Sequence, residues 1–351
     1  MLRERLLTRI ESDGPLPFEE FMRLVLYDPE DGYFAAGPLR SERAGDFLTS
    51  PEVSPLFGET IARFVDAEAA RIGADPVGVV EVGAGSGSLL RPLLDSLQTP
   101  AQAWVVEVSA AARREVAGRV PKARVAGELG EVPAPLRGVI VANEVADNLP
   151  AALAVRRGSG WAERRVGAVG GRLEWVETAS RPEVAAWAER WAGPVPEGGQ
   201  VEVQLEAGEW IAGLVGMLGA GAVLVFDYGE TGEGLAHRRP GGTLRTYRGH
   251  HLGPDPLLEP GSTDVTMDVD VAALAGAAGA AGARVEVVPQ AEFLERWGLG
   301  ERIAALRERE LALARERAAL ERLRARSERT GAETLLHPRG LGDFRVVVAS
   351  V

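Results

Sequence analysis

The sequence contains no cysteine among its 351 residues and one lysine, Lys122. Without cysteine there can be no disulfide bond, no thiolate-bound zinc or iron–sulfur cluster, and no cysteine nucleophile. The 51 acidic residues outnumber the 39 basic ones, so the net charge is −12. A protein that binds nucleic acid in general needs a basic face to displace counterions, so we expect no nucleic-acid partner.

Long hydrophobic runs are also scarce. The first ten residues include charged side chains and lack the 7–15-residue apolar stretch of a secretory signal, which predicts a cytoplasmic protein. Residues 210–226 carry no charge, but four glycines interrupt them and a β-branched stretch ends them. This pattern favours a helix, a glycine turn and a buried strand over a membrane span.

With 46% apolar residues, the chain is long enough for one large or two modest globular domains. Helical spacing of apolar residues predicts helices at 18–26 and 55–72, within an N-terminal helical region over 1–72. The rest of the predicted organisation is a main domain over 73–150, 200–298 and 339–351, a β-meander insertion over 151–199 and a charged helical segment over 299–338.

The main domain begins with alternating strand and helix patterns. Short β-branched runs at 77–82 and 104–108 are each followed by a helical stretch, which predicts parallel strands with helices on the sheet faces. Further strands are expected at 123–126, 139–142, 222–227, 284–288 and 344–349. The predicted fold is therefore α/β, a seven-stranded Rossmann-like sheet, mostly parallel, in which the last two strands form an antiparallel pair at the edge.

Two long segments interrupt or follow these strands. Residues 229–268 are rich in Gly, Pro and His, and a loop of this length is usually a lid or a binding element. Residues 300–330 are predicted to form a charged helix with a thin apolar stripe. Such a helix packs on the core or against a second copy of the chain, as in a homodimer; the alternative is a helix that binds another partner.

A glycine turn directly after the first strand of the sheet is the most informative motif. Its predicted cofactor-contacting residues are Glu81, Gly83, Ala84, Gly85 and Gly87. Glu107 ends the next strand, where a carboxylate can accept both ribose hydroxyls of a nucleoside. A pyrophosphate would meet the negative charge of Glu81, whereas the ammonium group of S-adenosylmethionine would suit it. The turn therefore favours S-adenosyl-L-methionine over a nicotinamide cofactor; a purely structural tight turn is the simpler alternative.

A second polar cluster follows the fourth strand. Asn143, Glu144 and Asp147 are expected at the carboxyl end of a central strand, where ligands of α/β sheets bind. Paired carboxylates could hold a guanidinium and help remove its proton. A helix cap with acids in its first turn explains the same residues equally well.

Other candidates are weaker. Asp227 and Tyr228 end the fifth strand and are expected on the same wall, and Glu128 with Leu129 follow the third strand, near where an adenine would lie. A solvent-exposed acidic residue in a loop is an equally good interpretation of Glu128. His250 or His251 is a candidate base, although a surface histidine is the commoner outcome. No metal is expected, because four dispersed histidines include no helix-spaced pair.

These motifs resemble, over nearly the whole chain, the MidA-like proteins, bacterial relatives of the mitochondrial complex I assembly factor that methylates an arginine. The most specific motif is the octet Gly-Asp-Phe-Leu-Thr-Ser-Pro-Glu at residues 45–52; Asn143-Glu144 with Asp147 and Asp227-Tyr-Gly occur in the family's order. The resemblance implies an S-adenosylmethionine methyltransferase fold, a methyl acceptor that is a protein arginine, and an octet whose Asp46, Thr49 and Ser50 close over the donor.

The chain departs from the family at two places. The glycine turn reads Gly-Ala-Gly-Ser-Gly-Ser at residues 83–88 where the family commonly has Gly-Pro-Gly-Arg-Gly-Thr, and Val145-Ala146 stand where apolar or aromatic residues are usual. The first change removes a charged side chain near the cofactor and the second reshapes the acceptor pocket. Two alternatives to a protein arginine methyltransferase therefore remain: a small-molecule methyltransferase of secondary metabolism, and a non-catalytic assembly factor that keeps the fold.

Overall fold

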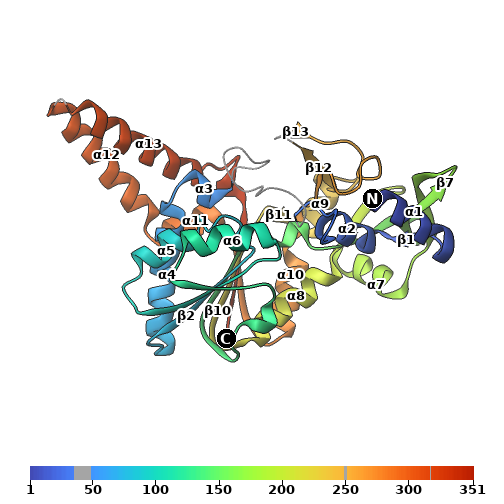
Figure 1. The fold of residues 1–351 in the computed structure, drawn as a ribbon, viewed down its shortest axis with the longest axis horizontal. Coiled ribbons are helices and arrows are strands. Elements are labelled where there is room, and N and C mark those ends of the chain that lie inside the picture. The colour runs from blue at the N-terminus through green and yellow to red at the C-terminus, as the bar shows by residue number, and fades with distance from the viewer. Residues whose placement is uncertain (35–48, 249–250, 317) are drawn as a thin grey trace.

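The computed structural model describes residues 1–34, 49–248, 251–316 and 318–351, and a seven-stranded sheet forms its centre (Figure 1). In spatial order the strands are β16 (Arg284–Pro289), β17 (Arg345–Ser350), β10 (Leu218–Asp227), β5 (Leu136–Asn143), β2 (Val77–Val82), β3 (Ala101–Val106) and β4 (Ala123–Ala126). Each overlaps a run that predicted it, so the α/β class is confirmed. The strand order reverses between β2 and β5, which makes the carboxyl ends of these two strands the expected place for a ligand.

The last two strands form the predicted antiparallel pair at the edge of the sheet. β17 pairs antiparallel with both β10 and β16, so β16 and not β17 lies at the edge. Val346, Val347 and Ala349 are all buried, as is usual for a strand covered on both faces. The sequence correctly predicted that the last two strands pair, but their order depends on contacts with β10.

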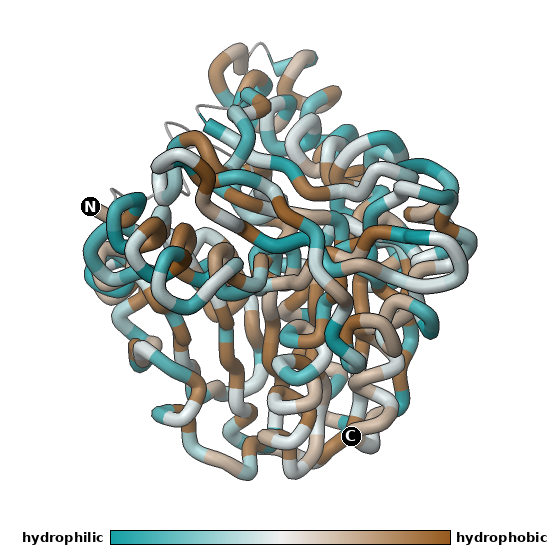
Figure 2. The backbone as a smooth tube through the Cα atoms, turned by 90° about the vertical axis from the view of Figure 1, so that its right-hand side faces the viewer, coloured by the Kyte–Doolittle hydropathy of each residue, from teal (hydrophilic) through white to brown (hydrophobic). Residues whose placement is uncertain are grey.

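Successive residues of the central strands enter two separate apolar layers. Val79 and Val141 face one layer, while Val80 and Ile140 face the other. The helices packed on the first face are α4 (Leu56–Ile72), α5 (Leu90–Ser96) and α6 (Ala110–Arg119), and those on the second are α8 (Leu205–Gly216) and α10 (Val271–Ala280). Hydrophobic stretches accordingly follow the central strands in Figure 2. No helix in the described ranges is both long enough and apolar enough to span a bilayer.

A second sheet lies beside the main domain. The predicted meander is present as β6 (Ala152–Arg157), β7 (Gly160–Val169) and β8 (Arg172–Ala179), followed by helix α7 (Pro182–Trp191). The strand β9 (Gln200–Val203) extends this sheet on one side, and the N-terminal β1 (Leu16–Pro17) pairs with β7. The first 27 residues and the insertion therefore form one unit, which the sequence did not predict, whereas α4 of the predicted N-terminal region packs on the main sheet.

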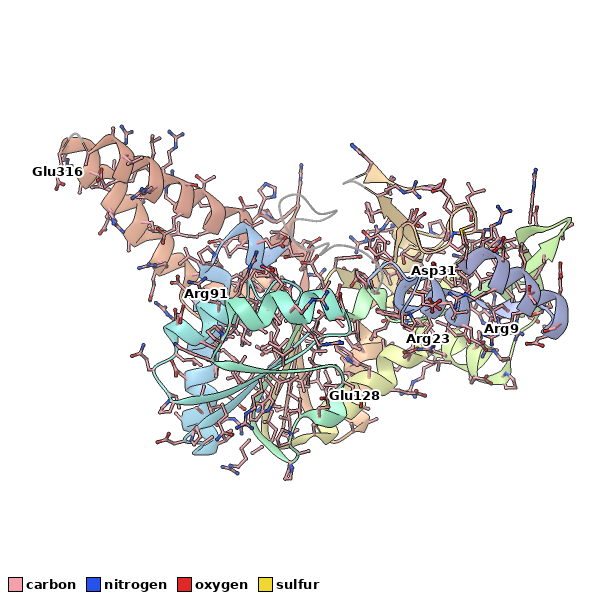
Figure 3. All side chains as sticks on the ribbon, viewed as in Figure 1. Arg9, Arg23, Asp31, Arg91, Glu128 and Glu316 are labelled. Atoms are coloured by element: carbon pink, nitrogen blue, oxygen red, sulfur yellow. The ribbon has the colours of Figure 1, made fainter. Side chains whose placement is uncertain are left out.

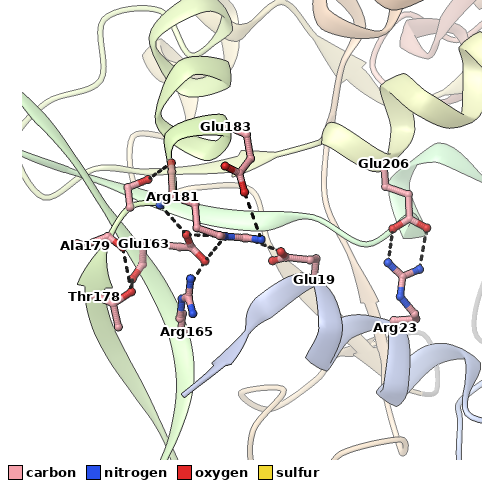
Figure 4. A network of polar contacts seen from close by, with 10 residues as sticks. Glu19, Arg23, Glu163, Arg165, Thr178, Ala179, Arg181, Glu183 and Glu206 are labelled. Carbon is pink, nitrogen blue, oxygen red and sulfur yellow. Dashed lines mark hydrogen bonds and ion pairs between the residues drawn. The ribbon is translucent and has the colours of Figure 1, made fainter. Parts of the chain in front are cut away.

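Ion pairs join helix α2 (Phe18–Tyr27) to the insertion and to the main domain (Figure 4). The buried carboxylate of Glu163 on β7 accepts from Nε of Arg181 at 3.0 Å, and Arg181 also pairs with Glu19 of α2. One turn further along α2, Arg23 donates two hydrogen bonds to Glu206 of α8, at 2.8 and 2.7 Å. Helix α2 is thus fixed on both sides.

The segment 229–268 is more ordered than the long loop that the sequence predicted. It contains β11 (Gly229–Glu230), α9 (Gly232–Arg238), and a small sheet made of β12 (Arg245–Arg248), β13 (His251–Leu252) and β14 (Asp264–Thr266). Its strands have only two to four residues each, and such short segments give little periodicity to detect.

The predicted charged helix is a hairpin of two helices, α12 (Leu299–Arg315) and α13 (Ala319–Leu335). The single-helix prediction was wrong because no glycine or proline marks the turn, where Ala318 adopts φ −80° and ψ 74°. Arg329 of α13 donates to Glu310 of α12 at 3.0 Å. The hairpin extends away from the sheet, with Glu316 at its far end (Figure 3).

Candidate functional site

A cavity of about 620 Å³ opens at the carboxyl ends of β2, β3 and β5. This volume lies in the range of small-molecule sites, and its position is the switch point of the strand order. One part is lined by the glycine turn after β2 and by the residues that follow β3 and β4. The other part is lined by residues after β5 and by α2, α8 and the N-terminal aromatic residues.

The glycine turn lies directly against the cavity. Gly83, Ala84 and Gly85 are lining residues, and Gly83 and Gly85 have φ angles of 71° and 50°. A Cβ atom on Gly83 would lie 2.6 Å from a methyl carbon of Val145. Glycine at this position therefore permits both the backbone conformation and the close approach of the next loop.

Glu81 is a buried carboxylic acid in the floor of the cavity. Burial, together with the charge of Glu107, raises the pKa of Glu81 to about 8, although the backbone N–H of Leu90 hydrogen-bonds to the carboxylate. Among the described residues its Oε2 has no hydrogen-bond partner. An unpaired buried oxygen costs free energy unless a ligand donor meets it, so Glu81 suits a cationic group.

Glu107 is held by the turn itself. Its Oε1 accepts from the backbone N–H of Ser109 at 2.8 Å and its Oε2 from that of Gly85 at 3.1 Å. Burial raises its pKa, and these two hydrogen bonds and the charge of Arg113 act in the opposite direction. Each oxygen keeps a second lone pair, which can accept one ribose hydroxyl.

Gly87 is not part of the cavity wall, contrary to the sequence prediction. Its φ is 77°, and a Cβ there would lie 2.8 Å from Val116 and 3.0 Å from Val120, at the end of α6. The third glycine of such a turn commonly allows a helix to pack closely, which is its role here.

Changing Gly87 to alanine is therefore expected to lower the free energy of unfolding by about 1–3 kcal/mol, through backbone strain and overpacking. Gly118→Ala is the matched control, because Gly118 lies in α6 with open space around its Cα. It should stabilise the protein by about 0.5–1 kcal/mol. Urea unfolding measures both; equal stability of the two variants would contradict this interpretation of Gly87.

The other residues predicted to contact the methyl donor, and the histidines predicted as a base, fall into three groups. Glu128, Leu129 and Thr49 line the cavity, and the side chain of Glu128, which follows β4, is exposed. Ser50 does not: its buried hydroxyl donates to Gln290 at 3.2 Å, so the predicted contact with the donor was wrong. Asp46 and His250 lie outside the described residues. The alternative base, His251, is exposed on β13 and is not a lining residue.

Asn143 and Glu144 end β5 and face the cavity from the other side. Glu144 has a φ of 53°, a left-handed conformation that no other non-glycine residue has in the described ranges. Asn143 Nδ2 donates to Glu144 Oε1 at 3.1 Å, and Asn143 Oδ1 has no partner among the described residues. Removal from bulk water, together with the charge of Asp147, raises the pKa of Glu144 to about 8, offset partly by hydrogen bonds from Asn143 and the Ser50 backbone.

Asp147 and Tyr228 line the cavity next to Glu144. Oδ2 of Asp147 accepts hydrogen bonds from Tyr228 and, at 2.6 Å, from Thr266, whereas its buried Oδ1 has no partner in the described part of the chain. Burial raises the pKa of Asp147 and these two hydroxyls lower it. The cluster is therefore more than a helix cap.

Asp227 has a different role from the one predicted. Its Oδ2 accepts from the backbone N–H groups of Ala146 at 2.9 Å and Asp147 at 3.2 Å, and it is not a lining residue. Burial and the charges of Asp147 and Glu144 raise its pKa well above the usual range. Asp227 supports the turn that presents Asp147 and does not itself face the cavity.

Several lining residues were not predicted as part of the site. They come from α2, from the segment after it and from α8, and they are Arg23, Tyr27, Tyr33, Phe34, Glu206 and Trp210. These residues lie in α2, in the segment after it and in α8, which packing brings to the cavity, and no local motif marks them. No group of three or more metal-ligating side chains is present among residues 1–34, 49–248, 251–316 and 318–351.

The raised pKa values predict an unusual pH dependence of stability. A carboxyl group whose pKa rises on folding binds more protons in the folded state, so stability falls as pH rises between the two pKa values. For Glu81 and Glu144 that window runs from 4.5 to about 8. Between pH 5 and 8 the melting temperature of the ligand-free protein should therefore fall, by on the order of 2 °C per pH unit.

Glu81→Gln should reduce this slope, and Glu81→Gln with Glu144→Gln should reduce it further. The control Glu308→Gln changes an exposed carboxyl of the hairpin and should leave the slope unchanged. Scanning calorimetry at several pH values measures the effect. A slope that is the same in all four proteins would contradict the raised pKa values.

Comparisons with known proteins agree with this geometry. The model of a family described as S-adenosyl-L-methionine-dependent methyltransferases matches residues 58–288. The protein arginine methyltransferase NDUFAF7 homolog, mitochondrial, of Drosophila melanogaster is 30% identical over 311 residues, which cover 77% of this chain and 68% of that protein. The protein arginine methyltransferase NDUFAF7, mitochondrial, of Mus musculus is 30% identical over 347 residues, with 88% and 76% covered.

A solved structure is similar over the whole chain. A COG1565 superfamily member from Burkholderia thailandensis, crystallised with S-adenosyl-homocysteine, has a TM-score of 0.85 and 29% identity. The alignment covers 100% of this chain and 92% of that one. The donor is S-adenosyl-L-methionine: unpaired Glu81 Oε2 suits its ammonium, and Glu107 suits its ribose. The chain therefore belongs to the MidA-like family of S-adenosyl-L-methionine-dependent methyltransferases.

Proposed function

We propose that this methyltransferase modifies a side-chain nitrogen of arginine in a protein substrate. The observation that carries the proposal is the acidic wall formed by Glu144 and Asp147 in the same cavity as the donor residues. Asp147 Oδ1 is buried and lacks a partner among the described residues, so it can accept a hydrogen bond from an incoming group. A guanidinium carries five N–H donors and a positive charge, and thus complements such a wall.

The two acids have a defined role in methyl transfer. S-adenosyl-L-methionine supplies an activated methyl group, so the protein has mainly to orient the acceptor nitrogen and accept its proton. Glu144 and Asp147 would together neutralise the guanidinium and hold one nitrogen toward the methyl group. Binding of this cation would also lower the raised pKa of each carboxyl, since an opposite charge favours the ionised form.

The relatives support the same acceptor. The Drosophila and mouse proteins are both named protein arginine methyltransferases, and each is 30% identical to this chain. In the present structure, Glu144 and Asp147 are the residues that would bind the arginine in such a reaction.

The test is methyl transfer from labelled S-adenosyl-L-methionine to the proteins and metabolites of a cell extract, read by mass spectrometry. We expect label on arginine residues of a small number of proteins, and none with Glu144→Gln. Label only on small molecules would favour a small-molecule methyltransferase. No label at all, with S-adenosylhomocysteine still bound in a calorimetric titration, would favour a non-catalytic assembly factor.

A further inference from the structure

The side chain of Asp147 is held by hydroxyl groups from two separate parts of the chain. Tyr228 follows β10 of the main sheet, whereas Thr266 lies in β14 of the 229–268 insertion. Both hydroxyls contact the same oxygen, Oδ2, and they also contact each other. Because Oδ2 is occupied twice, the carboxylate is fixed with its other oxygen, Oδ1, still available.

The backbone around Asp147 is fixed as firmly. Its N–H donates to Asp227 at 3.2 Å and its carbonyl accepts from the Met267 N–H at 3.1 Å. The next residue, Asn148, donates through its side chain to Asp264 at 2.9 Å and to the carbonyl of Val265 at 3.0 Å. The turn that carries Asp147 is thus bound to the insertion by both backbone and side chain.

Tyr228 is itself held in place. The guanidinium of Arg245 lies 5.4 Å from the centre of its ring, and Phe344 contacts the ring edge-on at 5.6 Å. Arg245 is paired with Asp268. Burial and the negative charge of Asp147 raise the pKa of Tyr228 well above its usual value, so the phenol keeps its proton and remains a donor.

From this arrangement we infer that Tyr228 and Thr266 are positioning residues that orient Asp147 Oδ1 as the proton acceptor of methyl transfer. The inference rests on the proposed arginine acceptor. As the acceptor nitrogen forms its bond to the methyl carbon, the carbon–sulfur bond breaks and its electron pair stays on sulfur. The N–H proton then moves to the carboxylate Oδ1 of Asp147, which leaves a methylated guanidinium that keeps its single positive charge, a neutral thioether and a neutral carboxylic acid.

The hydroxyls also determine how readily Asp147 ionises. Hydrogen bonds to the charged form of a carboxyl lower its pKa, so loss of either hydroxyl should raise the pKa of Asp147. The charged and titratable groups around it are Glu144, Asp227, Tyr27, Tyr228 and Arg245; Glu144 and Asp227 favour the neutral acid and Arg245 favours the carboxylate. The insertion therefore contributes both geometry and proton affinity to the site.

The test uses Tyr228→Phe, Thr266→Val and the conservative Thr266→Ser in the full chain. Steady-state methylation of the labelled extract protein should show kcat lowered about tenfold by Tyr228→Phe and by Thr266→Val, with the KM for the donor unchanged. Thr266→Ser should restore most of the rate. The pH at which kcat is half-maximal should move upward in the two impaired variants.

Thr246→Val is the matched control. It removes a buried hydroxyl from β12 of the same small sheet, where Thr246 donates to the carbonyl of Pro254 at 2.6 Å and does not line the cavity. This variant should keep the wild-type kcat and pH profile. If Tyr228→Phe, Thr266→Val and Thr246→Val all behave alike, the positioning roles are overturned.

A second readout needs no acceptor. The side-chain carboxyl ¹³C signal of Asp147, identified by its loss in Asp147→Asn, can be followed against pH in the complex with S-adenosylhomocysteine. Its titration should move to higher pH in Tyr228→Phe and Thr266→Val and stay unchanged in Thr246→Val. An unchanged titration in the first two overturns the inference, whereas absence of arginine methylation by the wild type, with the shift present, overturns only the proposed function.

Discussion

Replacing Glu107 by alanine is expected to weaken the binding of S-adenosyl-L-methionine and S-adenosylhomocysteine by about 100-fold. The carboxylate accepts hydrogen bonds from Ser109 and Gly85 and has one further lone pair on each oxygen for the ribose. Its loss would remove two charge-assisted hydrogen bonds to the nucleoside. It would also release the glycine turn, since the Gly85 N–H would lose its acceptor.

Isothermal titration with S-adenosylhomocysteine measures this effect directly. The control is Glu115→Ala on α6, which removes a carboxylate that is paired with Arg119 at the surface. Such surface pairs contribute little, so the control should bind like the wild type. An affinity of Glu107→Ala within threefold of the wild type would mean that the ribose is held elsewhere.

Changing Asp147 to asparagine is expected to lower kcat by about 10²- to 10⁴-fold while leaving the affinity for the donor unchanged. The amide has nearly the same shape, and Tyr228 and Thr266 can still contact it, but it cannot take up a proton at neutral pH. Because the substitution also removes a buried charge, the folded protein should be at least as stable as the wild type.

Single-turnover methylation of the labelled extract protein, together with calorimetric titration of S-adenosylhomocysteine, separates these effects. Asp95→Asn is the control, because Asp95 forms an exposed surface ion pair with Lys122 and neither residue lines the cavity. A rate for Asp147→Asn close to that of the wild type would assign proton transfer to Glu144 or to solvent.

The central strands β2, β3, β5 and β10 could be predicted because buried parallel strands are nearly continuous runs of apolar residues. Their carboxyl ends could be predicted with them, which brought Glu81, Glu107, Asn143, Glu144 and Asp147 to one edge of the sheet. For these residues local pattern and final position agree, because each lies at the end of a strand or within four residues after it.

The roles within a motif could not be predicted in the same way. Gly85 and Gly87 are two residues apart and look alike in sequence, yet one N–H hydrogen-bonds to Glu107 and the other glycine packs against α6. Asp227 and Tyr228 are neighbours, yet the first binds backbone N–H groups and only the second faces the cavity. Such differences depend on which elements pack nearby.

Contacts between distant segments were the hardest to predict. Thr266 is 119 residues from Asp147, and the strands of two to four residues around it carry no clear periodicity. The break between α12 and α13 likewise has no glycine or proline to mark it. In both places tertiary contacts and not local preference determine the structure.

The order of strands has a consequence for synthesis on the ribosome. β17 lies between β10 and β16 but follows β16 by more than fifty residues, among them the whole α12–α13 hairpin. Until residue 350 has left the exit tunnel, the nascent sheet must therefore end at β10, which is paired with β5 on one edge and unpaired on the other. During translation we expect β10 to be the segment that chaperones bind, and the last strand to be the one that releases them.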